Sequence, residues 1–348
     1  MRFVHAGDFH IGATPESGSE LGKKRASDVA GALGRVVDLC NTEKADLLLI
    51  PGDLFNAPPL TTQLKEAAYS FSRLETARVV IIAGNHDYLS ENCAYLDFNL
   101  GENVYLLSSD SMSSVYFEDI NTEVHGLSYH KKEIREPVYD GAMAPRDGRI
   151  HVLLAHGGDA LHAPIKYSDL SKSGFDYIAL GHIHQPKLFK GTRMAYCGSP
   201  EPLDRTDIGA RGCFVGEVTK KSFTIMWHPL ARTLYRSFDL VSDITLTQAA
   251  LEQCVKEEAA SHPGDLLIVN VTGSRDPAFS IDTDAVLNMD GVIEINDRTS
   301  PEYDLQKLLA DHDGDIISYY INVLDVPDKT PAMQKALYYG LNALLCKE

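Results

Sequence analysis

Five short clusters of metal-ligating residue types recur within the first 184 residues of the sequence. They read GDFH from residue 7, GDLF from residue 52, GNHD from residue 84, AHGG from residue 155 and GHIH from residue 181. Carboxylates and carboxamides favour manganese or magnesium, and imidazoles extend the range to iron and zinc. We therefore expect the metal ligands to be Asp8, His10, Asp53, Asn85, His156, His182 and His184.

These seven residues are enough for two divalent ions. Two ions about 4 Å apart need a bridging ligand, and Asp53 is our choice because its carboxylate offers one oxygen to each ion. Asp8, His10 and His184 would complete one ion, and Asn85, His156 and His182 the other. A hydroxide between the ions would be the nucleophile, because metal binding lowers the pKa of water. Manganese is the expected metal, with magnesium, iron and zinc as alternatives.

Two residues beside Asn85 predict a general acid. His86 should point towards a leaving group and protonate the departing oxygen. Asp87 should orient the His86 ring and keep it charged, as neighbouring carboxylates commonly do for histidines at metal sites. The predicted catalytic residues are therefore His86 and Asp87.

Each cluster directly follows a short apolar run that reads as a buried strand. The runs are residues 3–6, 47–51, 79–83, 151–155 and 177–180, and helical segments are expected at 23–42 and 62–76. Alternating strands and helices favour an α/β layer with mostly parallel pairing. Sites in such sheets form beyond the carboxyl ends of the strands, so the five clusters should converge. The glycine in each cluster permits tight turns and close backbone approach.

The pattern changes near His228 and Pro229. Beyond them we expect a helix at 242–259, strands at 266–271 and 292–295, and a closing helix at 331–346. The predicted organisation is therefore a dinuclear-metal phosphoesterase domain over residues 1–230 and a small α/β accessory or capping domain over residues 231–348.

Composition restricts the location and the partners. The formal net charge is −17, and residues 231–348 alone contain 20 acidic against 9 basic side chains. A broad basic surface for nucleic acid is therefore not expected, although two bound cations would attract an anionic substrate locally. The apolar runs are shorter than the roughly 20 residues of a membrane span, and the N-terminus does not read as a signal peptide. We expect a cytoplasmic protein with no membrane contact and six reduced cysteines.

The five clusters resemble the calcineurin-like metallophosphoesterase superfamily over residues 1 to about 230. The resemblance implies an α/β fold of two mixed β-sheets sandwiched between helices. GDLF, AHGG, GHIHQPKLF and AYCGSPEPLDRTD are most similar to the DNA repair exonuclease branch, with its SbcD-like and YhaO-like proteins and the double-strand-break nuclease subunit. Similarity to this branch implies that the chain is a metal-dependent DNA nuclease, either an exonuclease or an endonuclease, that acts in DNA repair. The implied partners are DNA, a coiled-coil ABC-type ATPase (SbcC-like) and a second copy of the chain.

Other interpretations remain open at this point. Many members of that branch have a histidine where Asn56 stands here, which leaves exonuclease against endonuclease activity and the polarity of cutting open. The preference for single- or double-stranded DNA is also open. Two other functions fit the clusters: a phosphodiesterase acting on small or cyclic nucleotides, and a non-catalytic scaffold of this fold. Arg205 and Arg211 could bind phosphate but more simply cap loops. The eight remaining histidines are expected to be structural or exposed: His5, His125, His130, His151, His162, His228, His262 and His312.

Overall fold

The computed structural model describes residues 1–91 and 93–345. The chain divides into two compact units, Met1–Leu234 and Tyr235–Glu348, and each has cores of its own. No helix within the described ranges combines the length and apolar character needed to cross a bilayer.

The first sheet of the N-terminal unit has six strands. Their order is β12 (Phe223–Pro229), β11 (Gly212–Val218), β1 (Arg2–His5), β2 (Leu47–Pro51), β3 (Arg78–Ile82) and β4 (Val104–Leu106). Strands β1 to β4 pair in parallel, whereas β11 is antiparallel to both of its neighbours, β1 and β12. The sheet is therefore mixed, with a parallel half that carries the first three ligand clusters.

The second sheet also has six strands and is also mixed. Its order is β5 (Ser113–Phe117), β6 (Thr122–Gly126), β7 (Ile150–His156), β8 (Tyr177–Gly181), β10 (Met194–Tyr196) and β9 (Lys187–Leu188). The four inner strands pair in parallel, and each edge strand is antiparallel to its neighbour. The last two ligand clusters follow β7 and β8.

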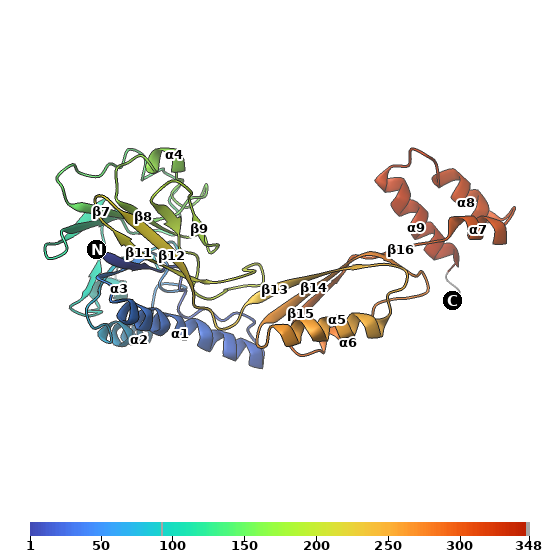
Figure 1. Ribbon diagram of the computed structural model, residues 1–348, viewed down its shortest axis with the longest axis horizontal. Coiled ribbons are helices and arrows are strands. Elements are labelled where there is room, and N and C mark those ends of the chain that lie inside the picture. Colours follow the sequence, from blue (N-terminus) through green and yellow to red (C-terminus); the bar gives the residue numbers. More distant parts are fainter. Residues whose placement is uncertain (92, 346–348) are drawn as a thin grey trace. The chain divides into compact units, whose positions relative to one another are not determined.

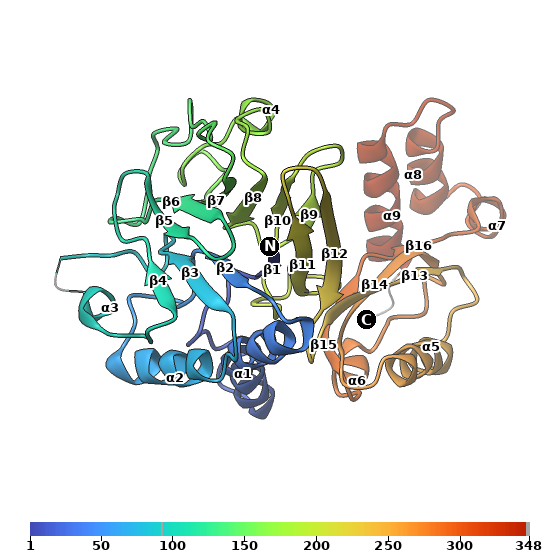
Figure 2. The same cartoon turned by 60° about the vertical axis from the view of Figure 1, so that its left-hand side comes forward.

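The two sheets pack face to face because side chains alternate along each strand. Phe3 and Leu49 of the first sheet share a core with Val152 and Tyr177 of the second. The outer face of the first sheet is covered by α1 (Glu20–Glu43) and α2 (Thr61–Ser72). Loops and the short α4 (Tyr167–Leu170) cover the other outer face, and α3 (Ala94–Asp97) is a single turn near the α2 side (Figure 1). Figure 2 shows the same layers from another side.

The predicted fold class is confirmed, and the five predicted strands correspond to β1, β2, β3, β7 and β8 with ends that differ by at most one residue. Helix α2 ends at Ser72, earlier than expected, because the Arg73 amide already bonds the Ser70 and Phe71 carbonyls. The parallel crossovers place the carboxyl ends of β1, β2 and β3 at one edge, which is where the site is built.

The C-terminal unit combines a parallel sheet with helices. Its strands are β13 (Tyr235–Ser242), β14 (Leu266–Arg275), β15 (Val292–Asp297) and β16 (Ser300–Pro301). Helices α5 (Gln248–Ser261) and α6 (Thr283–Leu287) pack on this sheet through Leu251, Val255 and Val286. Helices α7 (Leu305–Asp311), α8 (Ile316–Leu324) and α9 (Pro331–Leu345) share a separate core.

One expectation for this unit is wrong. The helix expected from residue 242 begins only at Gln248, because residues 235–242 form β13 and the Thr247 side chain caps the helix by accepting from the Ala250 amide. The closing helix is present as α9, and the last residue predicted for it, Cys346, lies outside the described residues.

Candidate metal centre

Three of the predicted ligands converge at the ends of β3, β7 and β8. The Asn85 side-chain oxygen lies 2.8 Å from His156 Nε2 and 3.1 Å from His182 Nδ1. The other ring nitrogen of His156 lies 2.8 Å from the Pro51 carbonyl, which fixes the ring with Nε2 towards the cluster. These three residues are the ones that the sequence assigned to one ion.

Three other predicted ligands gather beside them. His10 Nε2 and His184 Nε2 face each other at 3.2 Å. The Asp8 carboxylate accepts from the His182 amide at 2.8 and 3.0 Å, which ties the end of β1 to the end of β8. Asp8 and His10 are buried. The sequence assigned this group to the second ion.

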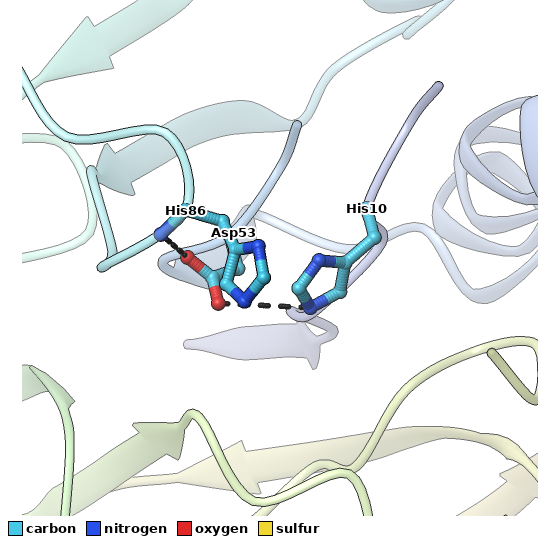
Figure 3. Close-up of side chains that lie close together, drawn as sticks. All are labelled: His10, Asp53 and His86. Atoms are coloured by element: carbon cyan, nitrogen blue, oxygen red, sulfur yellow. Dashed lines mark hydrogen bonds and ion pairs between the residues drawn. The ribbon is translucent and has the colours of Figure 1, made fainter. Parts of the chain in front are cut away.

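Asp53 lies between the two groups. Its Oδ2 is 3.6 Å from His10 Nε2 and 3.4 Å from His156 Nε2. Its Oδ1 accepts from the His86 amide at 2.9 Å. Figure 3 shows Asp53 between His10 and the backbone of His86. This position supports a bridging role for Asp53.

Four of the seven residues have left-handed backbone conformations. Asp8, His10 and Asp53 have φ of 51°, 48° and 50°, and His182 has φ of 99°. Residues other than glycine rarely adopt such angles, and they cluster at functional sites. Each angle turns the chain sharply at a strand end, so that the side chain projects into the cluster.

Two glycines allow the loops to close around the ligands. A Cβ at Gly84 would lie 2.2 Å from Asp53 Oδ1, and a Cβ at Gly52 would lie 2.3 Å from His156 Nδ1. Both distances are far below contact distance. The expected role of glycine in close backbone approach therefore holds at these two positions.

The charges in the cluster shift the pKa values of its members in opposite directions. Burial lowers the pKa of His10 to about 3. Burial also opposes a charge on His156, but Asp53 outweighs it and raises the pKa of His156 to about 9. Burial raises the pKa of Asp8 to about 6. Metal ions would compete with these protons, since the ligands must be deprotonated to bind.

Sequence reasoning missed Asp159, which lies between His182 and His162. Asp159 Oδ2 lies 2.7 Å from His182 Nε2, on the side of the ring opposite to Asn85. The same carboxylate lies 2.9 Å from His162 Nδ1, and the His162 and His182 rings are 4.6 Å apart. Asp159 follows AHGG directly, and this closeness to a ligand cluster is the one signal that could have found it.

A second supporting carboxylate belongs to Asp207. Its Oδ2 lies 3.4 Å from His184 Nδ1 and its Oδ1 accepts from Arg211 at 3.1 Å. Burial opposes a charge on His184, but Asp207 outweighs it and raises the pKa of this histidine. Arg211 is buried and also donates to Gln185, so it orders the loop beside the site. Arg205 pairs with Glu16.

The expected pairing of His86 with Asp87 is corrected. The buried Asp87 carboxylate accepts from the amides of Gly84, Leu54 and Phe55 at 2.7, 2.9 and 3.2 Å. It therefore joins the loops after β2 and β3 and is not directed at its neighbour. His86 Nδ1 instead lies 3.1 Å from the Asn56 carbonyl. The His86 ring stands 4.5 Å from the His10 ring, at the edge of the cluster.

The donor set fits two divalent ions. Two carboxylates, a carboxamide and four imidazoles converge, and two overlapping His and Asp groups, His10/Asp53/His86 and Asp53/His156/His182, lie close enough for metal binding. His10 Nδ1 is buried with no hydrogen-bond partner within the described part of the chain, although its Nε2 faces His184. At this distance the two Nε2 atoms are placed to give their lone pairs to one cation.

The comparisons with known proteins define the class. Residues 1–186 match the family described as calcineurin-like phosphoesterase. The chain belongs to this family, and together with the buried His and Asp groups this makes it a metal-dependent phosphoesterase.

Three relatives are more specific. The chain is 25% identical over 259 residues to the "uncharacterized metallophosphoesterase YhaO" of Bacillus subtilis, which covers 66% of this chain and 62% of the relative. It is 25% identical over 254 residues to a subunit of the nuclease SbcCD of the same organism, with 60% and 64% covered. It is 28% identical over 226 residues to the "DNA double-strand break repair protein Mre11" of Methanopyrus kandleri, with 58% and 49% covered. The chain thus spans less than two thirds of each of these relatives.

Proposed function

We propose that this chain is a DNA nuclease that hydrolyses phosphodiester bonds in DNA repair. The observation that carries the proposal is the convergence of all seven donors around Asp53 with His86 at the edge of the cluster. The names of two relatives, a nuclease subunit and a DNA double-strand break repair protein, support DNA as the substrate.

The residues divide the chemistry among them. Asp8, His10, Asp53 and His184 would hold one ion, and Asp53, Asn85, His156 and His182 would hold the other. Bound divalent ions, with manganese as our proposal, supply a water of lowered pKa and neutralise charge on the phosphate. The Asn56 carbonyl accepts from His86 Nδ1, which leaves Nε2 to carry a proton. His86 then protonates the departing oxygen of the DNA strand.

The test compares DNA with small phosphodiesters. Linear single-stranded DNA, linear duplex, closed circles, a cyclic nucleotide and bis(p-nitrophenyl) phosphate are incubated with the purified chain in manganese, magnesium or zinc. We expect cutting of DNA with manganese, and the circles distinguish an endonuclease from an exonuclease. Intact DNA alongside a cleaved cyclic nucleotide would replace this proposal with a small-molecule phosphodiesterase.

The acid role predicts a particular response of His86→Ala. A general acid contributes about 10² to 10⁴-fold to rate, so kcat on DNA should fall by this factor while the bound manganese is unchanged. The loss should be much smaller on bis(p-nitrophenyl) phosphate, whose phenolate leaves without a proton. His130→Ala is the control, because this exposed ring bonds the Ser108 carbonyl and not the cluster. If the wild type hydrolyses none of the substrates, or if His86→Ala leaves its hydrolysis unchanged, a non-catalytic scaffold would replace the proposal.

The same proposal includes a coiled-coil ABC-type ATPase as partner. It also includes a cytoplasmic location and self-association of the chain. Residues 231–348 are proposed to form an accessory or capping domain for DNA. The name of one relative, a subunit of SbcCD, supports a multisubunit assembly. Helix α8 adds an exposed apolar stripe, with Ile316, Tyr319 and Val323 exposed by 67%, 65% and 69%. An Ile316→Asp/Val323→Asp variant should lose co-purification with the ATPase from mild lysates and keep DNA cutting. Co-purification that persists, or a wild-type chain that elutes alone, would remove the partner from the proposal.

A further inference from the structure

A second group of metal-ligating side chains lies on the outer face of the second sheet. Glu123 and His125 alternate along β6 and therefore point to the same face. His151 of β7 stands opposite Glu123 in the parallel register. Val124 and Val152, their neighbours, point the other way into the core between the sheets. Glu123, His125 and His151 thus share one surface although they come from two strands.

Their ligand atoms lie close together. His125 Nε2 is 3.0 Å from His151 Nδ1, and Glu123 Oε2 is 3.9 Å from the first nitrogen and 3.6 Å from the second. All three atoms lie within 4.8 Å of one another. Ligand atoms about 2.0 Å from a tetrahedral zinc ion are about 3.3 Å from one another. The three side chains would therefore have to move by only a few tenths of an ångström to bind the ion.

Neighbouring groups orient two of the three ligands. Ser114 of β5 donates to Glu123 Oε1 at 2.7 Å, whereas Oε2 accepts no hydrogen bond within the described residues and faces the Arg149 guanidinium as an ion pair. Asp147 Oδ1 lies 2.9 Å from His151 Nε2. With the proton of His151 on Nε2, its Nδ1 presents a lone pair to the group. A carboxylate behind a histidine is the usual support of a metal ligand.

We propose that Glu123, His125 and His151 form a zinc site, with water in the fourth position. Two imidazoles and one carboxylate are a known protein ligand set for zinc. Glu123 and Asp147 carry two negative charges against one positive charge on Arg149, so the group attracts a cation. His151 is fully buried, whereas the side chains of Glu123 and His125 keep 13% and 11% exposure, which gives an ion access from solvent.

Arg149 is the competitor of this ion. Its Nη1 lies 2.9 Å from Glu123 Oε2. Its Nε also donates to Asp147 at 2.7 Å, and a second bond to Asp147 comes from Nη2. Because Asp147 holds the guanidinium from two nitrogens, the contact with Glu123 can be exchanged for zinc while Arg149 stays in place. Removal of the arginine charge should therefore tighten zinc binding.

This site is separate from the candidate metal centre. His156 is at the carboxyl end of β7, and His151 is five residues upstream near its start, which at about 3.3 Å per residue is about 16 Å. An ion there would join β6 and β7, with β5 held through Ser114. The proposal does not depend on the nuclease function.

The experiment counts zinc on the full-length chain. Metal-free protein is titrated with zinc chloride against a chromophoric chelator, and bound zinc is counted by mass spectrometry. We expect the wild type to hold one equivalent more than Glu123→Gln or His125→Gln. Ser114→Ala should weaken that equivalent about tenfold, as expected for a group that supports a ligand, and Arg149→Gln should strengthen it. Glu133→Gln, at an exposed glutamate paired with Arg135, is the matched control.

Two measurements keep the result decisive. Far-UV circular dichroism and manganese-dependent phosphodiester hydrolysis should be unchanged in Glu123→Gln and His125→Gln, which separates loss of this site from misfolding. If either variant fails to fold, the other carries the test, together with Arg149→Gln. Equal zinc counts in the wild type and in the folded variants would overturn the proposal, and would leave a histidine pair joined by a hydrogen bond.

Discussion

Individual side chains at the candidate metal centre depend on partners that hold their rings in place. His156 is held by the Pro51 carbonyl, His182 by Asp159 and His184 by Asp207. Such partners set the tautomer and the orientation of a ligand and raise its basicity. The ring of each of these three histidines is therefore positioned before any ion binds.

Asp159 permits a test of this support. Its side chain is 46% exposed, so Asp159→Asn should leave stability nearly unchanged. Burial opposes the charge on Asp159, but hydrogen bonds from His182 and His162 outweigh it and hold the pKa of Asp159 well below its usual range. Loss of this carboxylate should weaken manganese binding about 10- to 100-fold.

The measurement for Asp159→Asn is activity as a function of manganese concentration. The curve should move to higher manganese with the same plateau. Asp140→Asn is the control, since Asp140 pairs with Lys166. An unshifted curve would contradict the supporting role.

At the scale of elements, the strands bring the ligands to one edge and the loops give them their directions. The turns after β1 and β2 use left-handed residues, and the loops close over glycines. Asp87 then joins the loops after β2 and β3 through three backbone amides. The loops form one connected rim, because the amides of Asp8 and His10 also donate to the carbonyls of Gly52 and Asp53.

Gly84→Ala tests how closely this rim is packed. The added Cβ would lie 2.2 Å from Asp53 Oδ1 and 2.7 Å from His156 Cε1, so the bridging carboxylate must move. We expect destabilisation of about 1–3 kcal/mol, as for overpacking elsewhere, and loss of most manganese-dependent activity. Urea unfolding and a metal titration measure the two effects.

Gly31→Ala is the control for Gly84→Ala. Gly31 is exposed within α1, where alanine stabilises a helix by about 0.5–1 kcal/mol relative to glycine. Full activity in Gly84→Ala would show that the rim can relax.

His5 makes the packing of the two sheets sensitive to pH. It is buried on β1 against Tyr177 of β8, with His5 Nδ1 2.7 Å from the Tyr177 hydroxyl. Burial lowers the pKa of His5 to about 3 from 6.5. The unfolded chain thus binds this proton more readily, so stability is full above pH 6.5 and falls as the pH drops towards 3. The slope approaches about 1.4 kcal/mol per pH unit.

Urea unfolding between pH 4.5 and 7 measures this effect. His5→Gln keeps a polar partner for Tyr177 and removes the titration, so its stability should depend less steeply on pH than that of the wild type. Parallel curves for the two proteins would assign the acid sensitivity to other groups.

At the scale of the whole molecule, bound metal should stabilise one unit and not the other. The candidate metal centre lies within Met1–Leu234, and the C-terminal unit has cores of its own. A ligand present at 100 times its Kd stabilises the folded state by about 2.7 kcal/mol. Chelation with EDTA should therefore abolish hydrolysis and lower the Tm of the N-terminal unit.

Differential scanning calorimetry with and without EDTA checks this prediction. Residues 1–234 and 235–348, expressed separately, assign each transition. An unchanged Tm of the N-terminal fragment, or an equal shift in both fragments, would contradict it.

The sequence alone determined the donor types, their order and their place at successive strand ends. This was possible because apolar runs mark strands locally and parallel crossovers bring strand ends to one edge. It could not determine which loop groups touch. The Asp87 carboxylate was expected to orient His86, its neighbour in the sequence. It bonds the amides of residues 54, 55 and 84 instead, and two of these belong to another loop whose position the sequence does not show.

Only the tertiary structure decided the contacts between distant segments. It placed Asp159 behind His182 and Asp207 behind His184. It also brought His151 beside Glu123 and His125 through strand register, across more than 20 residues of sequence. The physical reason is that ligand chemistry is a property of each residue, whereas hydrogen-bond partners and shared faces depend on strand pairing and loop conformation.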